Sequence, residues 1–290
     1  MLRKPIFVVI LVFALVTLAC RVNFNLPVDR INVGETVTEE IRVESIDGED
    51  EPVRLNIDFG AGVLNLSPGN EDALISGTAV YNVPDFEPEI SVDGSEVELS
   101  TGVLEIRGIP NFESGRHKNE WDLDISDTPM ELVINAGAYQ GNFELGGLSL
   151  LSLHVRDGAS DVDLRLSDPN KVEMEEFEYE TGASQVNLHG LANANFERMR
   201  FNGGAGDYTL DFSGELLRDA EVRIEAGIGS LTIVIPDGTA ARVEVEGSLT
   251  NVDTRGDWER SGDEYVLDGS GPVITILISM GAGEVNLETR

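Results

Sequence analysis

"ISMGAGEVNL" (278–287) lies near the last residue of a 290-residue sequence, and an almost identical phrase, "IDFGAGVLNL" (57–66), lies some 220 residues earlier. Both have Gly-Ala-Gly at the centre and apolar residues at every second position on either side. A phrase that recurs over such a distance indicates an internal repeat, so further copies are expected between the two.

The further copies share a small or apolar residue that follows a glycine, here called the reference residue. The residues six and four before it are apolar, and so, with few exceptions, are those three and five after it. The reference residues are Ala61, Ala138, Ala159, Ala183, Ala205, Ile228 and Ala282, with a degenerate copy centred on Leu249. Apolar residues two apart predict a strand with one buried face. The alternation changes phase at the Gly-Ala step, which predicts a strand, a corner and a second strand, with the small residue pointing inward at the corner.

The spacing of the copies predicts how they are arranged. From Ala138 to Leu249 successive reference residues lie 21–24 residues apart, and the last step to Ala282 is 33. Units of about 22 residues are typical of a parallel β-solenoid, in which each coil stacks about 4.8 Å above the previous one. We therefore predict an all-β fold, a solenoid of two-strand coils with a less regular N-terminal β region. The alternative is an antiparallel β-sandwich that reuses one hairpin phrase.

Outward positions in such a solenoid form ladders. Four residues after each reference residue the side chain is short and polar, as at Asn65 and Asn142. Five residues before it, successive coils place His154, Glu178, Arg200, Arg223 and Glu244. Glu178 beside Arg200 is a favourable cross-strand pair, whereas Arg200 beside Arg223 is an unfavourable one.

The first twenty residues differ from the rest. A short basic start is followed by an apolar run over 6–18 and then by "TLAC" (17–20). The run is too short to span a bilayer and is typical of a secretory signal. "TLAC" resembles a bacterial lipobox, which predicts cleavage after residue 19 and a lipid on Cys20, the only cysteine. The alternative is a plain signal peptide or anchor with an incidental cysteine.

These patterns predict the domain organisation. Residues 1–19 are expected to be the signal peptide, and residues 20–38 the lipidated cysteine and a tether. An N-terminal β region (39–130) is expected to be either a separate domain or the first coils and cap of the solenoid. The repeat domain (131–290) carries an inserted hairpin within 253–272, which either caps the last coil or projects from it.

The charge excludes one class of partner. The sequence has 53 Asp and Glu against 20 Lys and Arg, a formal net charge of −33. Such a surface repels the phosphates of nucleic acid. We expect a membrane contact through the lipid on Cys20, and a glycan or an envelope protein as partner.

A family resemblance adds to this reading. The lipobox, "LNIDFGAGVLNLSPG" (55–69), "ALISGTAVYN" (73–82), a tryptophan-bearing strand and the serial Gly-Ala strands resemble the toast-rack family. They are also similar to the C-terminal domain of cell-wall-active antibiotic-response proteins and to β-solenoid adhesins. The similarity covers about residues 37–290. It implies an extracytoplasmic β-stack without known catalysis, and the antibiotic-response proteins imply a role in sensing envelope stress.

Candidate binding residues are few. Trp258 and Tyr265, in the late hairpin, are the best candidates for stacking on a glycan, although packing as a cap competes with that role. The basic cluster Arg116, His117 and Lys118 is a second candidate, as a docking point for an anionic ligand or as a solvated loop. His154 and His189 are expected to lie on opposite sides of the corner and not to converge.

Metal and catalytic signatures are weaker still. Asp157, Asp161 and Asp163 form a weak calcium candidate, since strand alternation directs Asp161 and Asp163 to one face. The alternative, which the pattern favours, is an acidic surface turn. Neither a Ser-His-acid arrangement nor a His/Cys metal spacing is visible, so no catalytic residue and no cofactor is predicted.

The sequence thus predicts a non-enzymatic, lipid-anchored protein outside the cytoplasm, with a binding, adhesion or structural role in the cell envelope. An envelope-stress sensor or regulator is one alternative. A carbohydrate-active enzyme on a β-helix scaffold is the other.

Overall fold

A computed structural model describes residues 33–46, 52–69, 72–101, 117–247 and 249–290. All 16 strands that these residues form belong to a single sheet. The only helical elements among them are two short 3-10 turns, η1 (Pro84–Phe86) and η2 (Leu191–Ala194). None of the described helices is long and apolar enough to cross a bilayer.

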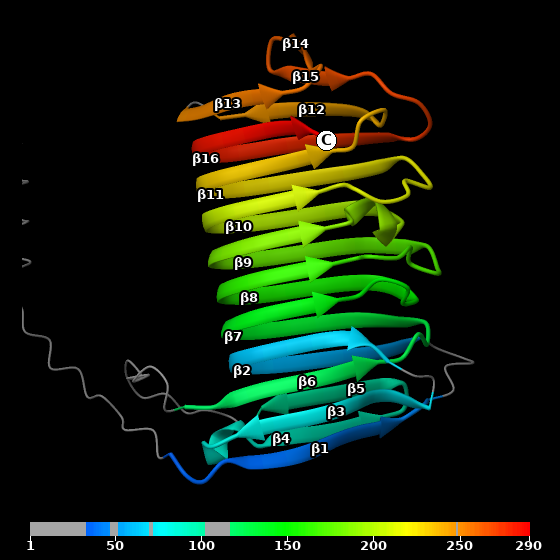
Figure 1. Cartoon of the computed structure of the whole chain (residues 1–290), viewed down its shortest axis with the longest axis vertical. Coiled ribbons are helices and arrows are strands. Elements are labelled where there is room, and N and C mark those ends of the chain that lie inside the picture. Colours follow the sequence, from blue (N-terminus) through cyan, green and yellow to red (C-terminus); the bar gives the residue numbers. More distant parts are fainter. Residues whose placement is uncertain (1–32, 47–51, 70–71, 102–116, 248) are drawn as a thin grey trace, which may run out of the picture. The chain divides into compact units, whose positions relative to one another are not determined.

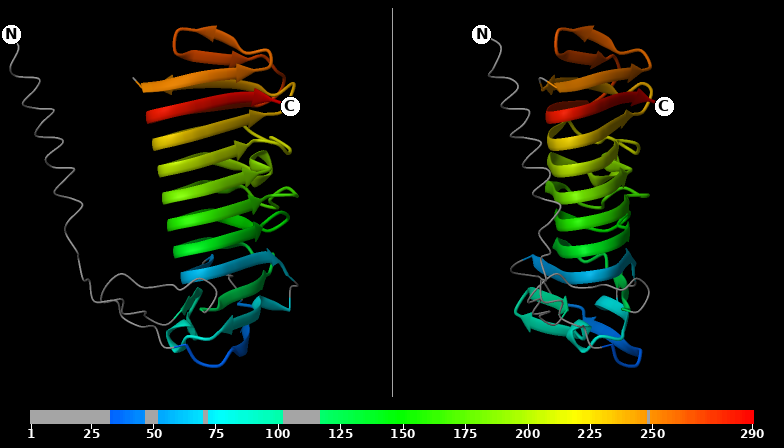
Figure 2. Two further views of the ribbon diagram at one scale, coloured as in Figure 1. Left: turned by 60° about the vertical axis from the view of Figure 1, so that its left-hand side comes forward. Right: turned by 90° about the vertical axis from the view of Figure 1, so that its left-hand side faces the viewer.

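The repeat copies form a parallel stack, which confirms the predicted solenoid and excludes the antiparallel sandwich (Figures 1 and 2). Each copy except the degenerate one at Leu249 is one long strand that passes through the corner, with its hydrogen-bonded ladder continuing on both sides. Reference residues pair in register, as Ala61 with Ala138 and Ala183 with Ala205. The long strands are β2 (Val53–Pro68), β7 (Met130–Glu144), β8 (Leu150–Arg165), β9 (Met174–His189), β10 (Phe196–Asp211), β11 (Ala220–Ile235) and β16 (Val273–Thr289).

The core lies between the two arms of each coil, where the predicted apolar positions meet. In β10, for example, Met199 and Phe201 before the corner, and Tyr208 and Leu210 after it, are all buried. Burying one such side chain contributes about 1.5–3 kcal/mol, so each coil is stabilised chiefly by the side chains enclosed between its arms. Phe201 packs edge-on against Tyr208, with ring centroids 5.0 Å apart.

The corner explains the repeated phrase. The glycine before each reference residue lies directly over the same glycine of the previous coil. A Cβ built on Gly204 would stand 2.3 Å from the carbonyl oxygen of Gly182. After the reference residue, Gly229 adopts a positive φ of 148°. Only glycine allows the backbones to approach this closely and to take that conformation without strain.

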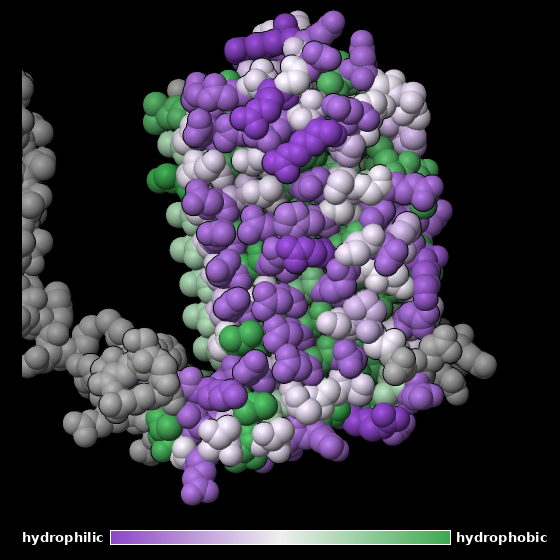
Figure 3. All heavy atoms as spheres, in the orientation of Figure 1, coloured by the Kyte–Doolittle hydropathy of each residue, from purple (hydrophilic) through white to green (hydrophobic). Residues whose placement is uncertain are grey.

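The reference residue itself points outward, so the predicted inward orientation was wrong. Ala138, Ala159, Ala183 and Ala205 are exposed. Ile228, the corresponding residue of β11, is 65% exposed. The glycine that precedes the reference residue already brings successive backbones into contact, which leaves no interior space at the corner. The outward column forms a narrow row of weakly apolar residues along one edge of the stack (Figure 3).

The stack does not follow chain order at its C-terminal end, contrary to the expected succession of coils. The last strand, β16, lies between β11 and the coil formed by β12 (Ala240–Glu246) and β13 (Leu249–Arg255). The predicted hairpin is present as β14 (Glu259–Ser261) and β15 (Glu264–Leu267). β15 pairs with β12 in an antiparallel sense and so covers the first arm of the outermost coil.

The N-terminal β region belongs to the same compact unit as the repeats. β2 is a complete coil beneath β7, and its other edge pairs in parallel with β5 (Glu96–Thr101) before the corner and β6 (Asn119–Ile125) after it. Antiparallel strands then cover both: β3 (Ala73–Tyr81) pairs with β6, β1 (Val37–Glu44) with β3, and β4 (Pro88–Asp93) with β5. This end of the stack is therefore capped by antiparallel pairing.

The predicted polar ladder is also present. Asn65, Asn142 and Asp122 pair in register. Asn142 donates to Asn65 at 2.7 Å, and Asn65 donates to Asp122 at 2.6 Å. Amide and carboxylate side chains of successive coils therefore form hydrogen bonds with one another along the outside of the second arms.

Candidate ligand-binding groove

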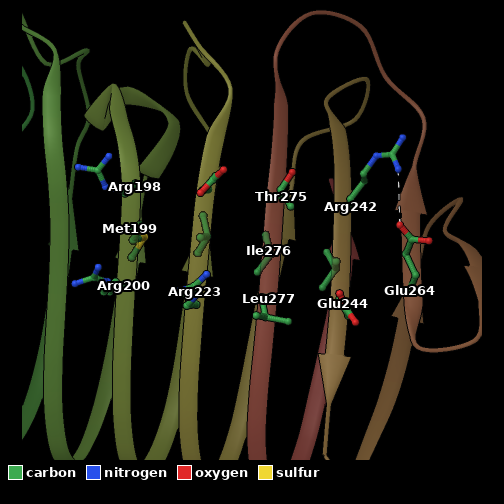
Figure 4. A pocket seen from close by; sticks show the side chains of 13 residues that line it. Arg198, Met199, Arg200, Arg223, Arg242, Glu244, Glu264, Thr275, Ile276 and Leu277 are labelled. Carbon is green, nitrogen blue, oxygen red and sulfur yellow. Dashed lines mark ion pairs between the residues drawn. The ribbon is translucent and has the colours of Figure 1, made fainter.

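A groove crosses the outer face of the first arms near the C-terminal end of the stack (Figure 4). Its volume is about 380 Å³. It exists because the outward side chains of β16, Thr275 and Leu277, are shorter than the arginines and glutamates on either side. The charged residues that line it are Arg198, Arg200, Glu221, Arg223, Arg242, Glu244 and Glu264.

Four of the 20 cationic side chains of a strongly acidic protein thus lie in one place. Arg200 pairs with Glu176 at 3.2 Å, and Arg242 pairs with Glu264 at 3.8 Å. Arg223 forms no ion pair with any residue that the structure describes. It is therefore the arginine in this groove that has none of the described carboxylates within ion-pair distance.

Arg223 also faces a like charge. It is the in-register partner of Arg200 on the neighbouring strand, as the sequence predicted. Like charges directly opposite each other destabilise a sheet by a few tenths of a kcal/mol to about 1 kcal/mol. In Figure 4 the guanidinium of Arg200 is turned away from Arg223 and toward β9, the strand that carries its partner Glu176.

A second hollow continues the groove toward the corner. Its volume is about 710 Å³, and it shares Arg200 and Arg223 with the first. Asn202, Ser279 and the corner glycines of β10, β11 and β16 also line it. From Thr275 to Gly281 the two hollows follow about six residues of strand, or about 20 Å. We call the combined surface the arginine groove.

The hairpin residues predicted to stack on a glycan lie at the rim of the capped end. Tyr265 is 2% exposed, and the Arg260 guanidinium lies over its ring at 5.2 Å. Trp258 is half-buried. Tyr265 therefore packs as a cap and has no free face for a sugar, whereas its neighbour Glu264 lines the arginine groove.

The predicted basic cluster falls partly outside the described residues, because Arg116 is not among them. The backbone N–H of Lys118 donates to the Asn82 side chain at 2.7 Å, and its ammonium lies 3.6 Å from Glu120. His117 directly precedes this anchored segment. Lys118 is thus held at the capped N-terminal end of the stack.

The three aspartates of the weak calcium candidate do not meet. Asp157 points into the coil, Asp161 is exposed, and Asp163 is bound by the guanidinium of Arg165 at 2.7 Å. Across the part of the chain that the structure describes, no three acidic, histidine or cysteine side chains are grouped to hold a metal ion. Asp157 occupies an inward position two residues before the corner, so strand alternation separates it from the others.

Asp157 is instead the centre of a hydroxyl network. Its carboxylate accepts hydrogen bonds from Tyr179 at 2.8 Å, from Tyr139 and Ser184 at 3.4 Å each, and from Thr181. Burial, more than the nearby Asp157 charge, raises the pKa of Tyr139 and Tyr179 well above its usual range. Both phenols therefore stay protonated and remain available as donors.

Asp157→Ala is expected to lower the free energy of unfolding by about 2–4 kcal/mol, because it leaves buried hydroxyl donors without an acceptor. Urea denaturation monitored by circular dichroism measures the change. Asp161→Ala, four residues away and exposed, is the matched control and should stay within about 0.5 kcal/mol of the wild type. Equal stability of the two variants would show that Asp157 does not hold the corner together.

The two described histidines of the repeats contact carboxylates. His154 Nδ1 lies 3.1 Å from Glu178, and His189 Nε2 lies 3.7 Å from Asp163. Neither is hydrogen-bonded to a hydroxyl group within the described residues. They lie on opposite arms of the coil, as the sequence predicted, and so do not assemble a nucleophile and base.

The comparisons place the fold within a family. The chain matches the family model described as the N-terminal domain of toast_rack, DUF2154, over residues 32–188 and 169–234. These matches together cover more than half of the sequence. The chain belongs to the toast-rack family. No curated protein matches the chain.

Two solved structures are similar to this toast-rack protein. A candidate cell adhesion protein from Clostridium sporogenes is 22% identical, with a TM-score of 0.50, and the match covers 88% of this chain and all of that one. A candidate lipid binding protein from Parabacteroides distasonis is 10% identical, with a TM-score of 0.39, covering 89% and 99% of the two chains. The similarity to the Clostridium sporogenes structure supports the solenoid fold described above.

Proposed function

We propose that this toast-rack protein is a non-catalytic binding protein of the adhesin type, held at the outer face of a cell membrane by a lipid on Cys20. The observation that carries the proposal is the arginine groove. It is an open surface about 20 Å long that presents charged and hydrogen-bonding side chains along the strand direction. Such a surface can hold an extended ligand along several coils.

The architecture supports a display role. A stack of coils is a rigid body in which each coil contacts only its neighbours, and its regular outer faces offer long binding surfaces. The structural relative from Clostridium sporogenes carries a name that refers to cell adhesion. An adhesive role for this chain is consistent with that name and with Arg223, which has none of the described carboxylates within ion-pair distance.

Binding without turnover is tested with the full chain purified in detergent and mixed with isolated envelope fragments. The expected result is that the protein sediments with the fragments and releases no reducing or unsaturated sugar from them. Serum albumin, also acidic, is the control for non-specific sedimentation. Failure of the protein to sediment would contradict the binding role, and released sugar would contradict the absence of catalysis.

The lipid anchor is tested separately, because Cys20 lies outside the described residues. In a bacterial host that processes lipoproteins, Cys20→Ala is expected to move the full chain out of the membrane fraction and to abolish incorporation of labelled palmitate. One acyl chain binds a membrane only marginally and stable anchoring needs more, so the diacylated and N-acylated cysteine of a lipoprotein is expected to hold firmly. Equal labelling of the variant and the wild type would contradict the assignment of Cys20.

A further inference from the structure

We propose that the arginine groove binds an oxyanion, carboxylate or phosphate, carried at intervals along an extended glycan. The inference rests on the binding function proposed above and names the chemical class of its ligand. It begins from Arg223, which the structure leaves without a counter-ion among the described residues and opposite a like charge on the next strand. An anion bound at Arg223 supplies the missing counter-ion and lowers that repulsion.

The guanidinium groups suit an oxyanion in geometry as well as in charge. Arginine presents a planar fork of donors that matches a carboxylate or a phosphate with two parallel hydrogen bonds. Arg200 already binds the carboxylate of Glu176, at 3.2 Å. Arg223 has the same fork and lines both hollows, and none of the described carboxylates lies within ion-pair distance of it.

The size and the remaining lining point to a polymer. Two connected hollows of about 380 and 710 Å³ exceed what a single small ion fills. Around the arginine pair, Thr275, Ser279 and Asn202 offer hydroxyl and amide groups along the strand direction. These groups complement the hydroxyls of sugar units.

The acidic residues in the groove exclude a densely charged ligand. Glu221 and Glu244 line the first hollow, and Glu225 lines the second. A chain with one phosphate per short repeat, such as nucleic acid, would place anions against these carboxylates and against a protein of net charge −33. A glycan with one acidic group per sugar or two can place its anion at the arginines and its hydroxyls at the glutamates.

The test compares two double variants of the full chain that lose the same charge. R200S/R223S removes the pair in the groove. R255S/R290S removes two arginines outside it, which are exposed and both pair with Glu288, at 3.5 and 3.1 Å. The probes are polygalacturonate as a carboxylate polymer, a poly(glycerol phosphate) chain as a phosphate polymer, and neutral dextran, with affinities measured by titration calorimetry at low salt.

The wild type and R255S/R290S are expected to bind at least one acidic polymer and not dextran, and R200S/R223S to bind it at least tenfold more weakly. Binding of one polymer alone identifies the anion as carboxylate or phosphate. Equal affinity of the two double variants, binding of dextran, or no binding of either acidic polymer overturns the inference. Melting temperatures establish that the variants are folded, and if R200S/R223S does not fold, R223K takes its place, since it keeps the charge and loses the fork.

The same variants separate this inference from the broader function. If R200S/R223S still sediments with envelope fragments as the wild type does, the protein binds the envelope through another surface and only the groove assignment fails. If the wild type itself does not sediment, the binding function fails.

Discussion

Gly204→Val is expected to lower the free energy of unfolding by about 3 kcal/mol or more and to reduce the yield of folded protein. A Cβ at this position would lie 2.3 Å from the carbonyl oxygen of Gly182 in the coil beneath. The obstacle is backbone in a hydrogen-bonded ladder, so relief requires that two coils separate. Single substitutions that force a steric clash of this kind are among those that lower the free energy of unfolding the most. Urea denaturation followed by circular dichroism measures the loss.

Ala205→Val is the matched control, one residue further along the same strand. This position points out of the corner, and the corresponding residue of the next coil is Ile228, which is 65% exposed. Valine should therefore be accommodated with a change within about 0.5 kcal/mol. If the two variants were destabilised equally, the corner would not have the orientation described, and if neither were destabilised, the contact between successive glycines would not be a constraint.

The repeat could be recognised from sequence because two physical signals coincide in it. Residues such as Met199 and Phe201 must alternate to face the interior, and glycine must recur where successive backbones touch, as at Gly204. Both requirements act within one coil, so a short window of sequence contains them. The parallel register and the outward polar ladder follow from stacking identical coils.

Chain order at the C-terminal end could not be derived in the same way. The coil formed by β12 and β13 differs from the others in having a corner at Leu249 that no glycine directly precedes. The alternation in 243–252 nevertheless fits a coil before β16 as well as one beyond it. Register within a coil is a local property. The position of a coil in the stack depends on which neighbour buries its face better, and that comparison involves residues far apart in sequence.

Only part of the arginine groove could be predicted from the sequence, for the same reason. The opposition of Arg200 and Arg223 could be predicted from the repeat alignment, although the sequence analysis noted it only as an unfavourable pair. The hollow beside it arises because β16, with Thr275 and Leu277, lies next to β11, which only the three-dimensional order shows. The aromatic candidates from the sequence, Trp258 and Tyr265, belong to the hairpin at the end of the stack.

Deletion of residues 273–290 is expected to unfold the C-terminal end of the stack while leaving the central coils folded. The deleted strand forms ladders with β11 on one side and with β12 and β13 on the other. It buries six apolar side chains: Ile274, Ile276, Ile278, Met280, Val285 and Leu287. At about 1.5–3 kcal/mol each, their burial contributes roughly 9–18 kcal/mol, as much as the whole stability of many domains.

Limited proteolysis with mass spectrometry locates the damage. Residues 240–267 should become susceptible, because β12 and β13 lose their only parallel partner, whereas β7 to β9 should stay protected, because coils interact only with their neighbours. A synthetic peptide of residues 273–290 added in trans should restore protection, and the same peptide with Ile276→Asp should not, because it places a charge in the core. Continued protection of 240–267 without any peptide would mean that the β12–β13 coil docks directly on β11, and β16 would then be an insertion that the stack does not require.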